Sequence, residues 1–225
     1  MPGVVVSALL SPPVTDSDHE YRLYLPPCFS ADSRYPVLYL IPGRSSEPDA
    51  WFDAGLAITL DRLILSKDVP PFLLVVTGNI EGDPLGDTIY YKLIPALEEE
   101  YPVIGDRAYR AVAGGSLGGI AAYRLAFQHP ETFSSAAIFG AGAISGEETR
   151  IISWLSSLDD TTPLRVFMDS GTEDPLMLRR AQVMKSLLDE AGIANTLHSG
   201  QGGHTYSYWV GNFGLYLKWL AEGWQ

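Results

Sequence analysis

The chain has 225 residues, of which 46% are hydrophobic and 19% are charged. That balance is typical of a folded globular protein and excludes a disordered chain. The formal net charge of −12 at pH 7 would repel phosphate backbones and anionic lipid headgroups, so neither nucleic acid nor a membrane is an expected partner. A single cysteine, Cys28, excludes an internal disulfide framework, and the length predicts one domain over residues 1–225.

The start of the chain carries no positive charge ahead of its apolar stretch, unlike a secretory signal. No stretch reaches the roughly 18 apolar residues that a membrane span requires. Cytoplasmic is therefore the default expectation, and secretion stays open because a signal peptide that had been cleaved would leave the same sequence. The sequence does not indicate an oligomeric state.

Strands and helices are predicted to alternate along most of the chain. Runs rich in β-branched and aromatic residues predict strands at residues 4–9, 20–25, 37–41, 72–76, 109–113, 136–139, 164–168 and 195–198. Helical spacing of apolar residues predicts helices at 56–66, 88–100, 117–128, 149–158, 176–191 and 206–221. From the third strand on, this order predicts an α/β fold with a mostly parallel central sheet and helices on both faces. The first two strands have no helix between them, so we expect them to pair antiparallel at one edge.

A Gly-x-Ser-x-Gly pattern stands where the strand at 109–113 meets the helix at 117–128. Gly114, Ser116 and Gly118 form it. The pattern alone is common, and a plain glycine turn would also explain it. Its position between a buried strand and an apolar helix is typical of the nucleophile elbow, where a sharp turn lifts the serine hydroxyl clear of the sheet. The sequence therefore predicts Ser116 as a nucleophile.

A serine nucleophile needs a base, and His204 is the best placed of four histidines. It follows the glycine-rich residues 200–203 after the last strand and precedes the final helix. In this type of fold the base comes last, after the serine and the acid. His19, His129 and His198 each have a structural explanation in a turn, at a helix end and within a strand.

The acid that orients the base must lie between Ser116 and His204. The loop after the strand at 164–168 offers Asp169, Glu173 and Asp174. We favour Asp174, because a turn of this length carries it away from the strand end and toward the histidine. Asp174 could instead cap the helix that begins at Pro175, since Asp-Pro is a common helix start, and Glu173 and Asp169 remain alternatives.

Two backbone N–H groups are expected to stabilise the oxyanion of the reaction. One belongs to Leu117, which follows the nucleophile. The other should come from the loop after the strand at 37–41, where Pro42 has no N–H and the donor must be Gly43 or Arg44. We favour Arg44 as the donor and assign Gly43 to substrate binding.

Trp51 and Trp209 are further candidates for substrate binding, although core packing would also account for either of them. Few residues remain for a lid, so we expect an open site.

Four segments resemble the putative esterase family, which includes esterase D, feruloyl esterases and enterochelin esterases and is similar to the mycolyltransferases. These segments are residues 34–40, 113–119, 171–174 and 202–204. The resemblance covers the chain from about residue 20 to residue 220. It implies an α/β-hydrolase that acts on carboxylic esters, with Ser116, Asp174 and His204 at the triad positions.

One departure from the family pattern is visible at Pro42-Gly43, where the family usually has His-Gly. This departure affects the expected shape of the oxyanion loop and of the acyl pocket. As a hypothesis, the Arg44 side chain favours a substrate with a carboxylate or polar acyl group.

The predicted function is hydrolysis of a small-molecule carboxylic ester through an acyl-enzyme on Ser116. One alternative is acyl transfer by the same triad, as in the mycolyltransferases. Another is a noncatalytic α/β-hydrolase scaffold, although such proteins usually lack one triad residue. No cofactor and no metal are expected, because the sequence has no His-Glu-x-x-His, no Gly-x-x-x-x-Gly-Lys and no Cys-x-x-Cys.

Overall fold

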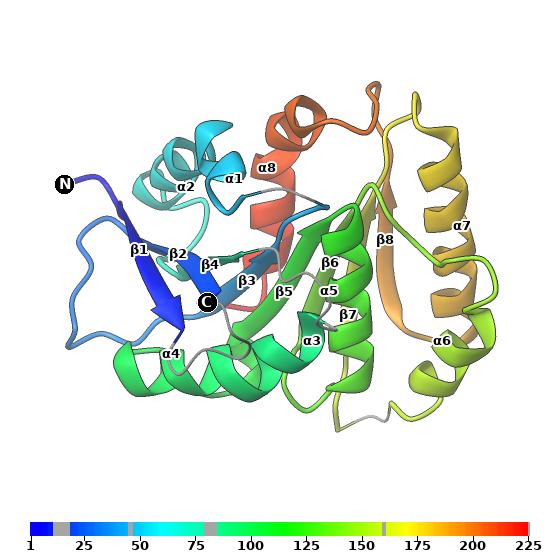
Figure 1. Ribbon diagram of the computed structural model, residues 1–225, viewed down its shortest axis with the longest axis horizontal. Coiled ribbons are helices and arrows are strands. Elements are labelled where there is room, and N and C mark those ends of the chain that lie inside the picture. The colour runs from blue at the N-terminus through cyan, green and yellow to red at the C-terminus, as the bar shows by residue number, and fades with distance from the viewer. Residues whose placement is uncertain (11–18, 45–46, 79–84, 159–160, 225) are drawn as a thin grey trace.

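A single sheet runs through the computed structural model, which describes residues 1–10, 19–44, 47–78, 85–158 and 161–224. In this part of the chain eight strands lie in the order β1-β2-β4-β3-β5-β6-β7-β8 (Figure 1). Their bounds are β1 Val4–Leu10, β2 His19–Leu25, β3 Val37–Ile41, β4 Leu73–Thr77, β5 Arg110–Gly115, β6 Ser135–Phe139, β7 Arg165–Asp169 and β8 Ala194–His198.

The direction of the strands agrees with the prediction. β1 pairs antiparallel with β2, β2 pairs antiparallel with β4, and every other pairing is parallel. The central strands β3, β4, β5 and β6 are buried at every position, as expected of parallel strands covered on both faces. The mostly parallel sheet with an antiparallel edge is confirmed.

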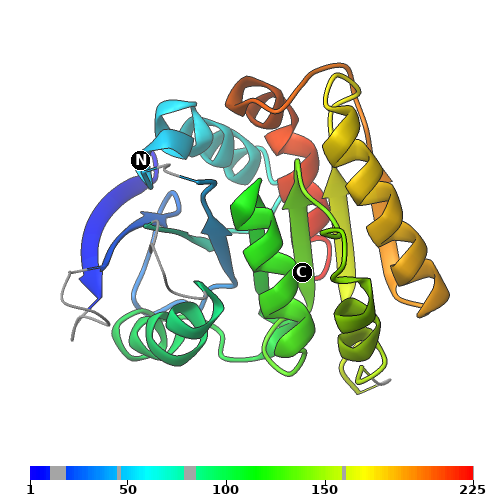
Figure 2. The ribbon, with the colours of Figure 1, turned by 45° about the vertical axis from the view of Figure 1, so that its right-hand side comes forward.

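The helices of the described residues divide between the two faces of the sheet. They are α1 Asp49–Asp53, α2 Leu56–Leu65, α3 Leu85–Thr88, α4 Ile94–Glu100, α5 Leu117–Gln128, α6 Glu148–Leu155, α7 Pro175–Glu190 and α8 Tyr206–Ala221. α1, α2 and α8 contribute to the apolar core on one face, and α4, α5, α6 and α7 contribute to the core on the other. Figure 2 shows α5 in front of the sheet and α8 behind it.

Two helical segments differ from the prediction. The helix expected at 88–100 is interrupted by a π-helical turn, Ile89–Leu93, between α3 and α4. Pro95 follows this turn, and because proline donates no N–H and crowds the preceding turn, regular α-helical bonding cannot continue through it. The short helix α1 was not predicted, since five residues are too few for a periodic signal.

None of the described helices is both long enough and apolar enough to cross a membrane. That residues 1–225 form one domain stays a prediction.

Candidate active site

Ser116 lies in a sharp turn between β5 and α5. Its backbone has φ 56° and ψ −119°, a conformation that non-glycine residues rarely adopt and that is typical of functional sites. The turn is held by the Ser116 N–H, which donates to the carbonyl of Phe139 at 2.8 Å. The hydroxyl group is thereby placed at the carboxyl end of the sheet.

The two glycines of the motif let backbone segments approach closely. A Cβ atom on Gly118 would lie 2.1 Å from the carbonyl oxygen of Ile41, and one on Gly114 would lie 2.2 Å from the backbone of Gly118. Any side chain at these positions would push α5 away from β3 and β5. The glycines are therefore required by packing around the serine.

Ser116, His204 and Asp174 form a chain of hydrogen bonds across three loops. Ser116 Oγ lies 2.9 Å from His204 Nε2, and His204 Nδ1 lies 2.7 Å from Asp174 Oδ2. An ionised carboxylate only accepts, so in the neutral imidazole the proton sits on Nδ1 and Nε2 is free to accept the serine proton. The His204 and Asp174 side chains are 37% and 14% exposed, so solvent reaches the site from the histidine side.

Asp174 combines the two roles that the sequence left as alternatives. Its Oδ1 accepts the N–H of Met177 at 3.3 Å and caps α7, while its Oδ2 faces His204. Each carboxylate oxygen thus has its own partner.

The other two candidate acids have different surroundings. Asp169, at the end of β7, is fully buried and accepts hydrogen bonds from the hydroxyl groups of Tyr208 and Tyr216. Its carboxylate lies 3.2 Å from Nδ1 of His198. Glu173 is exposed. The structure therefore brings Asp174, of the three, to the imidazole of His204.

The loop that follows β3 lies against the start of α5. A Cβ atom on Gly118 would be 2.5 Å from the carbonyl oxygen of Pro42, so the backbone before Gly43 and Arg44 lies beside the elbow. Leu117 is the first residue of α5, and the first N–H groups of a helix have no acceptor within it. Residues 45–46 of the same loop lie outside the described residues.

Trp51 and Trp209 lie beneath the elbow. Only 0% and 3% of their surfaces are exposed, and their ring centroids are 5.9 Å apart. A Cβ atom on Gly115 would lie 3.2 Å from each indole ring, and the ring of Trp209 meets that of His204 edge-on at 5.1 Å. The structure therefore places both tryptophans in the packing that supports the serine and histidine, and their substrate-binding role stays a prediction.

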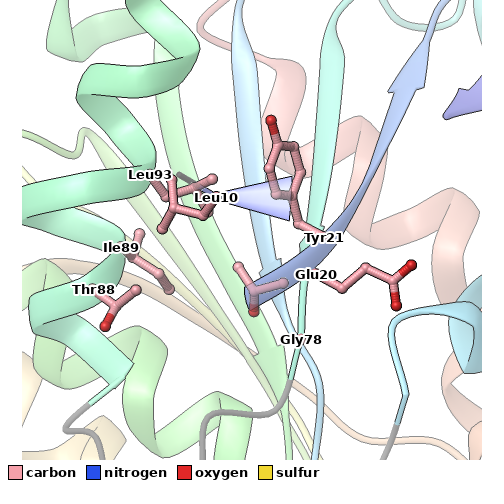
Figure 3. Close-up of a pocket in the computed structure, with 8 residues that line it drawn as sticks. Leu10, Glu20, Tyr21, Gly78, Thr88, Ile89 and Leu93 are labelled. Atoms are coloured by element: carbon pink, nitrogen blue, oxygen red, sulfur yellow. The ribbon is translucent and has the colours of Figure 1, made fainter. Parts of the chain in front are cut away.

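A small cavity opens elsewhere on the sheet, between β1, β2 and β4 and the π-helical turn. Tyr21, Ile89 and Leu93 are among the residues that line it, while the Glu20 carboxylate points away (Figure 3). Its volume of about 20 Å³ is close to that of one water molecule, and none of Ser116, His204 and Asp174 lines it. The cavity is too small to hold an ester substrate.

Comparison with known proteins identifies the family. The model of the family described as "Putative esterase" matches residues 85–220, a region that contains Ser116, Asp174 and His204. The chain belongs to this esterase family. The predicted family is confirmed.

Two curated proteins illustrate the similarity of this esterase-family chain to longer relatives. An uncharacterised protein of Corynebacterium glutamicum is 23% identical over 238 residues, which cover 88% of this chain and 56% of the relative. The iron(III) salmochelin esterase of Escherichia coli is 26% identical over 227 residues, which cover 88% of this chain and 53% of the relative. The chain thus spans about half the length of these relatives.

A solved structure supports the fold of this esterase-family chain. A ferulic acid esterase superposes with a TM-score of 0.87 at 24% sequence identity, covering 99% of this chain and 100% of that one. The α/β-hydrolase fold is therefore confirmed.

Gly140 is a site residue of this esterase-family chain that sequence reasoning missed. It follows β6 with a positive φ of 54°, and a Cβ atom there would lie 3.0 Å from His204 Nδ1 and 2.7 Å from the Trp209 ring. Only glycine leaves room for the imidazole at this point. The available signal was a glycine directly after a predicted strand, which many turns share.

Proposed function

We propose that the chain hydrolyses carboxylic esters of small molecules, with Ser116 as nucleophile, His204 as base and Asp174 as the orienting acid. The continuous hydrogen-bonded path from Asp174 through His204 to the Ser116 hydroxyl carries this proposal. Membership of the esterase family and the strained backbone of Ser116 support it.

In the first half of the reaction, His204 Nε2 takes the proton of Ser116 as Oγ attacks the carbonyl carbon of the ester. The tetrahedral intermediate then collapses, the bond to the leaving alcohol breaks, and His204 returns the proton to that alcohol. Ser116 is left as an acyl ester. In the second half, His204 takes a proton from water as the water oxygen attacks the same carbonyl carbon. The bond from this carbon to Ser116 Oγ then breaks, and His204 returns the proton to Oγ, so that the acid is released and Ser116 is restored.

Asp174 acts on the imidazole throughout. Its carboxylate holds His204 in the tautomer that can accept from Ser116 and stabilises the imidazolium that forms in both halves. Because the same side chain caps α7, the carboxylate is held in place by the helix that follows it.

Backbone donors are proposed to stabilise the charge on the carbonyl oxygen. The N–H of Leu117 stands at the start of α5, where the helix dipole also favours negative charge. The N–H of Arg44, or that of Gly43, is proposed as the second donor. Each such donor typically accelerates the reaction by about 10²–10³-fold.

The test compares wild type with Ser116→Ala and with Ser186→Ala as a matched control. Ser186 is an exposed serine in α7 whose hydroxyl donates to the Gln182 carbonyl, so its loss should leave activity unchanged. The substrates are p-nitrophenyl acetate and methyl ferulate, the second because a structural neighbour is named a ferulic acid esterase. We expect Ser116→Ala to lose about 10⁴-fold or more in kcat.

Covalent labelling gives an independent measurement. A fluorophosphonate should add once to wild type and to Ser186→Ala, but not to Ser116→Ala, and peptide mass spectrometry should place the adduct on Ser116. Wild-type activity in Ser116→Ala, or an adduct on another residue, would refute the proposed nucleophile.

A further inference from the structure

The loop that carries His204, residues 199–205, rests on the ring of Tyr208. A Cβ atom on Gly202 would lie 2.3 Å from Tyr208 Cδ2, so the loop backbone packs directly on the ring. Gly202 has a φ of +146°, a conformation that glycine adopts readily. This close contact fixes the distance between the loop backbone and the ring of Tyr208.

The hydroxyl group of Tyr208 makes two hydrogen bonds of opposite sense. It donates to Asp169 Oδ1 at 2.6 Å and accepts the N–H of Gly200 at 3.0 Å. Burial raises the pKa of the Tyr208 hydroxyl, and the bond to Asp169 raises it further, so the group remains a donor at neutral pH. Tyr208 therefore links the buried end of β7 to the loop of His204.

The other side of the loop is fastened to the segment that carries Asp174. The N–H of Thr172 donates to the Gly200 carbonyl at 2.9 Å, and the N–H of Glu173 donates to the Gly202 carbonyl at 2.8 Å. Figure 1 shows the start of α7 and the loop before α8 next to each other. Gly200 is thus held through its N–H by Tyr208 and through its carbonyl by the acid-bearing segment.

Tyr216 offers a comparison within the same cluster. It also donates to Asp169, through Oδ2, but its ring stacks on Phe139 at 4.1 Å inside the core. Its hydroxyl group binds the same carboxylate as that of Tyr208, whereas the bond with Gly200 belongs to Tyr208.

We propose that Tyr208, anchored by Asp169, is a positioning residue. It holds the backbone of the His204 loop where the imidazole can contact Asp174 and Ser116 at the same time. Tyr208 is buried and acts through the loop backbone. This inference rests on the proposed function, because it assigns His204 as the base.

The expected effect follows from the geometry of the loop. Without the hydroxyl group, the Gly200 N–H loses its acceptor, and on this side only the ring contact with Gly202 still holds the loop. A shift of about 1 Å at a reacting group can lower the rate about 10²-fold. We therefore expect Tyr208→Phe to lower kcat about 10–100-fold with KM within about twofold of wild type.

Tyr216→Phe is the matched control. Each variant removes one hydroxyl donor from the same buried carboxylate and keeps the aromatic ring, so both should lose stability. Only Tyr208→Phe should lose kcat, measured on p-nitrophenyl acetate well below both unfolding temperatures. Equal kcat values for the two variants would overturn the inference.

Proton NMR tests the positioning without catalysis. The His204 Nδ1 proton shared with Asp174 should give a sharp downfield signal in wild type and in Tyr216→Phe, and a broadened or absent one in Tyr208→Phe. In wild type, the amide proton of Gly200 should exchange slowly. A Gly200 amide that exchanges as fast as solvent-exposed loop amides would overturn the inference, even if Tyr208→Phe failed to fold. Failure of the proposed function would appear separately, as full activity in Ser116→Ala.

Discussion

Replacing Asp174 by asparagine separates the two roles of this side chain. Oδ1 caps α7 through the N–H of Met177, and Oδ2 accepts from His204 Nδ1. An asparagine can keep its carbonyl oxygen on the cap, because asparagine and aspartate are equally good N-caps. Its amide nitrogen then faces His204 and can only donate. The imidazole is driven to the tautomer with the proton on Nε2, which cannot accept from Ser116.

The size of each effect follows from these contacts. The wrong tautomer lowers kcat about 10⁴-fold in a serine protease with the same arrangement, and we expect a loss of about 10³–10⁴-fold in kcat for Asp174→Asn. Its stability should stay close to that of wild type. Asp174→Ala removes the cap as well, which costs about 1 kcal/mol and lowers the unfolding temperature by about 2–4 °C in a domain of this size.

The assay combines ester hydrolysis with thermal unfolding of Asp174→Asn, Asp174→Ala and Glu173→Gln. Glu173→Gln controls for the neighbouring carboxylate, which is exposed, and should keep both activity and stability. If Asp174→Asn retained wild-type kcat, or if Glu173→Gln lost it, the assignment of the acid would be wrong. Equal unfolding temperatures for Asp174→Asn and Asp174→Ala would refute the capping role.

Two predictions concern stability. Gly118→Ala should lower the free energy of unfolding by about 1–3 kcal/mol or more, because its Cβ would lie 2.1 Å from the Ile41 carbonyl oxygen; Gly211→Ala in α8, with no atom within 4 Å of its Cβ, should be neutral or stabilising in chemical denaturation. Burial alone would raise the pKa of Glu147, but hydrogen bonds from Arg124 and Tyr123 outweigh it and hold the pKa below the ordinary value of 4.5. The stabilisation from Glu147 is thus present above pH 4.5 and lost as the pH falls through the lowered pKa. Glu147→Gln should lower the free energy of unfolding by about 2 kcal/mol at pH 7. The difference in this free energy between the variant and wild type should shrink as the pH falls. A difference that stays constant from pH 7 to pH 3 would contradict this account.

The sharp turn at Ser116 and the overall fold could be predicted because their signals are local. Ser116 stands in a short motif between a strand and a helix, and α5 and α8 begin and end where the spacing of apolar residues predicts. The alternation of strand-like and helix-like segments likewise predicts the parallel sheet. The order of serine, acid and histidine along the chain then points to His204.

Local signals favoured Asp174 but left Asp169 and Glu173 as alternatives, because all three lie within six residues of one another. The choice depends on which carboxylate the fold brings to His204, and that contact joins residues 30 apart in the chain, while the bond from His204 to Ser116 joins residues 88 apart. Tertiary packing also decided that Trp51 and Trp209 lie beneath the elbow and that Tyr208 holds the histidine loop.

The sequence by itself determined which chemical groups this protein has and the order in which they follow the parallel strands, because the patterns that indicate strands and helices extend over only a few residues. The tertiary structure alone decided which groups meet, since distances between loops depend on the register and packing of the whole sheet.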